Sequence, residues 1–250
     1  MNWSAITAQL FKLLLQLAAA IAASWGLRQT GFYEFTAREA EGLNTVILLL
    51  GNIYAVMYAF VIFVIWSQWT DVENFVMREC NALTDLLRFA DHLDPEAGHT
   101  LRRAVADYAQ KVLKSEWRAL GEHRRDKQTE RTFSELMDAV IRTPPADPAA
   151  DAIRQRLIGI VREAAEHRDE RVTKSLTRIP ATLNRLVDTM AGALLLLVFA
   201  YPFHHWLVGA SCFTLLAVVL FLANVVMEDT DNPFNGVCNV SSQPFSDLTS

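Results

Sequence analysis

Basic residues are scarce outside the middle of the chain, and this shortage says most about the kind of protein. Of the 23 Lys and Arg in 250 residues, only Lys12, Arg28 and Arg38 precede residue 78, and none follows Arg185. The net charge of −5 provides no basic surface, which excludes nucleic acid as a partner. Apolar ends around a charged middle are typical of a membrane protein with a polar insert.

Cysteines and catalytic motifs are equally scarce. Cys80, Cys212 and Cys238 are too few and too scattered for a disulfide framework or a thiolate metal site. The chain also lacks a Ser-His-Asp set, a phosphate loop and an HExxH motif. We therefore predict no catalytic residues, no metal site and no resident cofactor, and we do not expect an enzyme.

Four apolar stretches predict an all-α membrane protein with four transmembrane helices. They are Ile6–Leu27, Leu43–Trp69, Leu186–Tyr201 and Trp206–Met227. The first stretch has a second interpretation as a cleaved signal peptide, with Lys12 as its basic flank and Ala20-Ile21-Ala22 as its cleavage site. The last two form a hairpin, and His204-His205 at its turn are either interfacial polar residues or a metal- or pH-sensing pair.

The second apolar stretch continues into the charged middle without a break. No Pro or Gly occurs between Asn52 and Asp94, and apolar residues recur at three-and-four spacing from Val72 to Ala90. This pattern predicts one helix from about Asn44 to about Ala90. Further amphipathic helices follow, the last with Asp151 as its N-cap.

The order of these segments predicts a cytosolic helical domain inserted between transmembrane helices 2 and 3. The expected parts are 1–69 with helices 1 and 2, 70–180 as the helical domain, 181–228 with helices 3 and 4, and 229–250 as a tail. The domain holds most of the Lys and Arg, which favours an inner-membrane protein with the domain and both termini in the cytoplasm. Seven charges between Arg162 and Arg171 indicate either a solvated helix face or a charged vestibule.

Short motifs at the junctions resemble the bestrophin-like domain family. They are "FVIFVIWSQWTDVENF" at the end of the second membrane helix, "TRIP" before the third and "NPFNG" after the fourth. The resemblance implies a homopentameric, passive ion channel whose pore is lined by the second helix. The alternative is a membrane-anchored helical scaffold or signalling protein that does not conduct.

The second helix can be compared with that expectation. At 100° per residue, one stripe carries Asn44, Gly51, Ala55 and Ile62, with Asn52 and Ala59 at its edge. One interpretation is that the stripe lines a pore, because the amides of Asn44 and Asn52 are costly in lipid and should face water or protein. The other is that the small residues form a helix face that packs closely against a neighbouring helix. Bestrophins have bulky apolar residues where this chain has Gly51, Ala55 and Ala59. The constriction would then lie elsewhere, toward Ile62 or Trp69, or the protein does not conduct as bestrophins do.

The stretch "MEDTDNPFNG" ends the last apolar run abruptly. Its candidate site residues are Glu228, Asp229, Asp231, Asn232, Pro233 and Phe234. We predict that the acids end the helix at the membrane interface and that Pro233 prevents its continuation. The tail would then run as an extended strip along the helical domain, anchored by Phe234 and Phe245. The alternative is a calcium site, for which the acids and Asn232 offer oxygen ligands.

Overall fold

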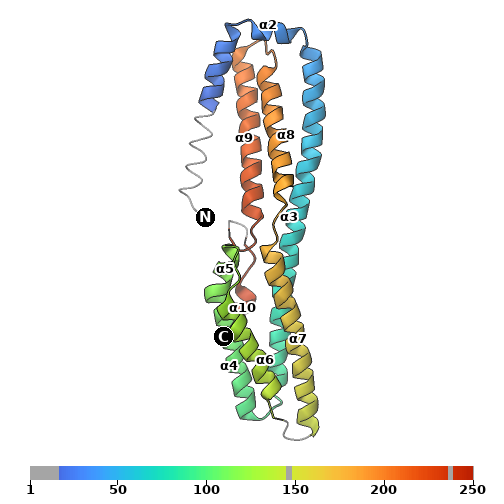
Figure 1. The fold of residues 1–250 in the computed structure, drawn as a ribbon, viewed down its shortest axis with the longest axis vertical. Helices are drawn as coiled ribbons and strands as arrows, with labels where there is room; N and C mark the ends of the chain where they lie inside the picture. The colour runs from blue at the N-terminus through green and yellow to red at the C-terminus, as the bar shows by residue number, and fades with distance from the viewer. Residues whose placement is uncertain (1–16, 145–147, 236–238, 250) are drawn as a thin grey trace. The chain divides into compact units, whose positions relative to one another are not determined.

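The structure, a computed structural model, describes residues 17–144, 148–235 and 239–249. Every regular element within those ranges is a helix, as the sequence predicts (Figure 1). In chain order they are Leu17–Arg28, α2 (Phe32–Ala37), α3 (Ala40–Ala90), α4 (Pro95–Lys111), the π-helical η1 (Val112–Glu116), α5 (Trp117–Gly121), α6 (Lys127–Arg142), α7 (Pro148–Leu176), α8 (Ala181–Ala200), α9 (Trp206–Thr230) and α10 (Gln243–Asp247).

The chain divides into two compact units, which we describe separately. The apolar unit contains the described residues up to Ile65 together with Ile179–Glu228. The charged unit contains Trp66–Arg178 and the described residues from Asp229 onward. Helix α3 contributes to both units and is helical at every residue from Ala40 to Ala90, which confirms the predicted single helix.

The apolar unit is built from helices suited to a membrane. Within the described residues, three helical stretches are long and apolar enough to cross one: Ala40–Ala90, Ala150–Ala200, which includes α8, and Trp206–Thr230. Leu17–Arg28 is a shorter apolar helix, and the rest of the predicted first transmembrane helix lies outside the described residues. The small core of this unit joins α3, α8 and α9 through Val61, Val187 and Met227.

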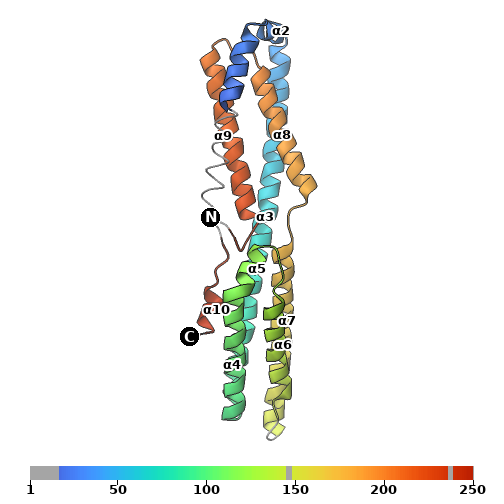
Figure 2. The same cartoon turned by 60° about the vertical axis from the view of Figure 1, so that its left-hand side comes forward.

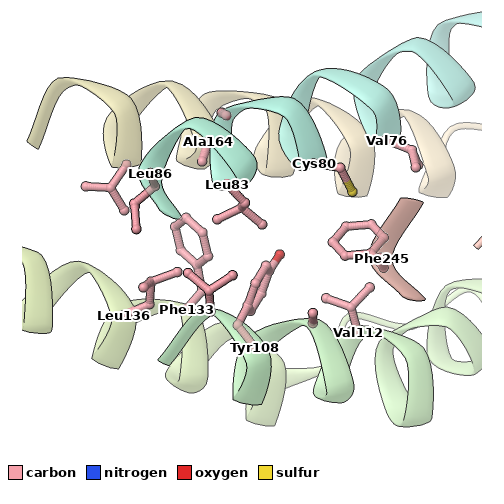
Figure 3. Close-up of a cluster of buried hydrophobic side chains, with 14 of the residues drawn as sticks. Val76, Cys80, Leu83, Leu86, Tyr108, Val112, Phe133, Leu136, Ala164 and Phe245 are labelled. Atoms are coloured by element: carbon pink, nitrogen blue, oxygen red, sulfur yellow. The ribbon is translucent and has the colours of Figure 1, made fainter. Parts of the chain in front are cut away.

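The charged unit has a larger core shared by α3, α4, α6 and α7. Figure 3 shows Leu83 and Leu86 of α3 facing Tyr108 of α4 and Leu136 of α6 across it. Local signals explain the helix boundaries. The Asp94 carboxylate accepts hydrogen bonds from the backbone N–H groups of residues 96 and 97, which caps the first turn of α4.

Two helix boundaries differ from the simplest reading of the sequence, and the predicted N-cap at Asp151 was wrong. Helix α7 begins at Pro148, because proline is well suited to the first turn, so Asp151 lies inside the helix and pairs with Arg154 at 2.9 Å instead of capping it. Helix α9 continues past Met227 to Thr230, so Glu228 and Asp229 belong to its last turn. The helix ends among the acids, between Asp229 and Asp231, two residues before the helix-breaking pair Asn232-Pro233.

Candidate functional site

The predicted pore residues of α3 divide between two environments. Asn44, Asn52, Ala55 and Ala59 are exposed in the single chain. Gly51 instead faces α8, since a Cβ atom there would lie 4.0 Å from Leu194, and Ile62 packs against the small core of the apolar unit. The predicted stripe therefore lies along the border of the buried face.

The most exposed line of α3 runs opposite its buried face. Asn52, Val56, Ala59 and Phe63 lie within about 60° of one another around the helix, at 100° per residue. Val56 is 70% exposed and Phe63 is 68% exposed. The Asn52 side-chain amide donates a hydrogen bond to the Leu48 carbonyl at 2.9 Å. Large apolar side chains without cover from their own chain mark a surface for lipid or for other subunits.

A buried charge cluster occupies the centre of the charged unit. Arg171 of α7 is 0% exposed, and its Nε donates to Oε2 of Glu79 on α3 at 2.7 Å. Its Nη2 donates to Oε2 of Glu116 on η1 at 2.8 Å. Arg168 donates from Nη2 to the other oxygen of Glu116 at 2.6 Å, and Tyr108 of α4 donates to Glu79. Two arginines thus balance two glutamates, as buried charges require.

The cluster stabilises one charge state of its members. Burial alone would lower the pKa of Arg171, but Glu79, Glu116 and Tyr108 together hold that pKa well above its usual value. Burial, and then the Glu79 carboxylate, raise the pKa of Tyr108 well above its usual value. Arg171 therefore stays protonated, and Tyr108 remains a hydrogen-bond donor.

The C-terminal tail closes this cluster. Phe245 of α10 is 0% exposed, and its ring lies 5.3 Å from the Arg171 guanidinium carbon. Figure 3 shows the Tyr108 ring between Phe133 and Phe245. Phe234 packs edge-on against Trp117 at 4.7 Å. Both predicted anchors, Phe234 and Phe245, therefore contact the charged unit, although residues 243–247 form the short helix α10 and not an extended strip.

The turn at Asn232 is held by protein contacts. The Asn232 side-chain amide donates to the Gly121 carbonyl at 2.9 Å, and its Oδ1 accepts from the Phe234 N–H at 3.2 Å. Arg178 donates to the Asp231 carbonyl at 2.6 Å. Among the residues that the structure describes, no three His, Cys, Asp or Glu side chains gather as a metal site. The calcium alternative, built on Glu228, Asp229, Asp231 and Asn232, stays an untested hypothesis.

Sequence reasoning missed the charge cluster. It treated the charges of α7 as a solvated face or a vestibule, whereas Arg168 and Arg171 are buried. The signal was present in the spacing. Leu157, Val161 and Ala164 set a buried face, and residues 168, 171 and 175 continue it at three-and-four spacing. An arginine on the apolar face of a helix needs a buried carboxylate, and Glu79 and Glu116 occupy the equivalent faces of their helices.

A known protein family has a model that matches most of this chain. The model of the bestrophin-like domain matches residues 17–245. The chain belongs to the bestrophin-like family. The resemblance drawn from the junction motifs is therefore confirmed, over nearly the whole chain.

Solved structures share the bestrophin-like fold at low sequence identity. One is a bacterial bestrophin homologue from Klebsiella pneumoniae, phased with zinc, at 14% identity and a TM-score of 0.69, covering 96% of this chain and 98% of that one. A variant of the Klebsiella pneumoniae homologue with an isoleucine replaced by threonine matches at 11% identity and a TM-score of 0.71, covering 95% and 98%. No curated protein matches the chain. These likenesses establish the bestrophin-like fold.

Proposed function

We propose that this bestrophin-like protein is an ion channel subunit, and that five copies surround a pore lined by the exposed face of α3. Family membership supports the channel, because the resemblance to bestrophins implies a homopentameric ion channel. The basic residues gather in the charged unit, which favours the cytoplasm for that unit and the inner membrane for the apolar unit.

The observation that carries the proposal is the uncovered line of α3 that contains Asn52. Asn52 and Asn44 are exposed within residues 43–69 of α3, a mainly apolar part of the helix that carries no charged residue. An amide at membrane depth is costly in lipid, so it is expected to face protein or water. A ring of copies would place the Asn52 line around a common axis and leave the remaining apolar residues for lipid and for neighbouring subunits.

The same line suggests where the pore is narrowest. Ile62 and Trp69, the positions expected from sequence, both pack against cores of their own chain. Val56 and Phe63 are the large apolar residues on the Asn52 line. A ring of Phe63 side chains would form a hydrophobic constriction that gates by dewetting, while Ala59 leaves the adjacent turn wide.

Flux from liposomes that contain the purified full chain tests the channel proposal. Salt-loaded vesicles should release ions faster than empty vesicles, and particle images should show five subunits. Flux equal to that of empty vesicles across several salts would support the alternative, a helical scaffold whose working part is the charged unit. Flux together with a subunit count other than five would retain the channel and reject the pentamer.

The Asn52→Leu variant should alter conduction or assembly while inserting normally. The substitution removes the amide from the line of Asn52, Val56, Ala59 and Phe63, so the water path or the subunit contact changes while this part of the helix becomes more apolar. Flux and subunit count are the measurements. Ile53→Leu, at the next position, is the matched control and should leave both unchanged. Normal flux and normal assembly in Asn52→Leu would show that this amide faces lipid.

The Phe63→Ala variant should increase flux by about threefold or more, because a smaller ring of side chains lowers the dewetting barrier. Phe60→Ala provides the control, since Phe60 is also exposed but lies off the Asn52 line, about 80° from Asn52 around the helix, whereas Phe63 lies about 20° from Asn52. The flux of Phe60→Ala should match that of the unmodified protein. Equal increases in both variants would argue for general loosening of the helix and against a constriction at Phe63.

A further inference from the structure

The apolar unit contains a small cavity that the channel proposal does not use. Residues of Leu17–Arg28, of the start of α2 and of the turn between α8 and α9 line it. Figure 2 shows the helix Leu17–Arg28 beside α9 near that turn. Its polar rim is formed by Ser24, Arg28, Tyr33 and Tyr201, and Ile21, Val198 and Phe213 contribute apolar wall. The cavity measures about 30 Å³, which is room for about two water molecules.

Arg28 places an unbalanced charge at the rim of this cavity. Its Nη2 donates to the Phe203 carbonyl at 2.9 Å, and its guanidinium carbon lies 5.5 Å from the centre of the Tyr33 ring. In the part of the chain that the structure describes, no carboxylate forms an ion pair with Arg28. An arginine has five N–H donors, so most of them remain available to an anion.

Neighbouring contacts hold the cavity in shape. The Tyr33 hydroxyl donates to the Phe199 carbonyl at 3.0 Å, close to the C-terminus of α8. Phe203 packs so tightly on α9 that a Cβ atom at Gly209 would lie 2.9 Å from its ring, which is closer than Cβ atoms normally approach other atoms. The turn between α8 and α9 is therefore fixed against α9, and Arg28 is fixed against that turn.

We propose that Arg28 and the rim around it bind the phosphate of an anionic phospholipid, with an acyl chain along the apolar wall. A guanidinium forms paired hydrogen bonds with phosphate oxygens, and a lipid with one net negative charge balances Arg28. Trp25 lies on the same helix as Arg28, and Trp206 is the first residue of α9. Both are exposed, as expected for residues at the level of lipid headgroups. The joined polar rim and apolar wall favour a lipid over free phosphate.

Native mass spectrometry of the full chain tests this site. The protein is mixed with phosphatidylglycerol or phosphatidylcholine, with and without inorganic phosphate. The unmodified protein should retain phosphatidylglycerol in preference, and Arg28→Gln should bind it about tenfold more weakly. Arg28→Lys should recover part of the binding. Arg38→Gln removes the same charge from an exposed residue nearby and should bind as the unmodified protein does.

The possible results separate the explanations. Equal binding by Arg28→Gln and the unmodified protein would overturn the proposal and leave Arg28 as a cap for the carbonyl of Phe203. Equal loss in Arg28→Gln and Arg38→Gln would reduce the effect to net charge and would also overturn it. Displacement of the lipid by millimolar phosphate would overturn the lipid assignment. A Gly209→Ala variant, which displaces Phe203, should weaken retention while Arg28 is intact.

Discussion

Replacing Arg171 with methionine should destabilise the charged unit by about 3–5 kcal/mol, the usual cost of breaking a buried ion pair by removing one partner. The loss is large because Glu79 and Glu116 would stay buried while only Arg168 remained to balance them. Methionine fills much of the space of the arginine stem, so a cavity contributes little. The midpoint of thermal or denaturant unfolding of the full chain in detergent is the measurement.

Arg162→Met is the matched control, because Arg162 lies on the same helix but is exposed. It should change stability by less than about 0.5 kcal/mol. The double variant Arg171→Met with Glu79→Gln should recover part of the loss, since it removes one of the two buried carboxylates and leaves Glu116 paired with Arg168. An unfolding midpoint for Arg171→Met equal to that of Arg162→Met would show that the cluster contributes nothing to stability.

The cluster connects segments that are far apart in sequence. Glu79, Glu116 and Arg171 come from α3, η1 and α7, and Tyr108 adds α4. A buried ion pair often stabilises no more than apolar residues of similar volume would. What these charges require is one arrangement of the helices, because any shift would leave a carboxylate or a guanidinium without its partner.

The helices themselves were predictable from sequence. The absence of Pro and Gly between Asn52 and Asp94 was enough to predict α3 as one helix, because nothing in that stretch interrupts the backbone hydrogen bonds. The junction motifs around Trp69 and Pro233 were enough to recognise the family. Both depend on local order along the chain, which a sequence states directly.

The partners of the buried and border residues were not predictable from sequence. Gly51 fits a pore stripe by its angle, yet it faces Leu194, because the position of α8 decides which side of α3 is covered. Arg168 and Arg171 resemble surface charges until Glu79 and Glu116, more than 50 residues away, are placed beside them. Such pairings depend on the packing of distant helices, and helical periodicity indicates only that a residue is on the inner face.

The tail contributes the last part of the same core. Edge-on aromatic contacts run from Phe234 to Trp117, from Trp117 to Phe245 and from Phe245 to Tyr108. Each such contact adds about 0.5–1.5 kcal/mol beyond the area it buries. Phe245 also covers the guanidinium of Arg171, so it excludes water from the ion pairs and strengthens them.

Truncating this side chain in Phe245→Ala should therefore cost about 3–5 kcal/mol, as for other fully buried phenylalanines. The tail should also become accessible, so limited proteolysis near α10 should quicken as the unfolding midpoint of the full chain falls. Phe245→Leu keeps most of the apolar volume but loses the ring contacts. Its unfolding midpoint should lie between those of the unmodified protein and of Phe245→Ala. Ser246→Ala, at the adjacent exposed position, should behave as the unmodified protein does. If Phe245→Ala retained both the unfolding midpoint and the protease resistance of the unmodified protein, α10 and the aromatic contacts of Phe245 would contribute nothing to the stability of the charged unit.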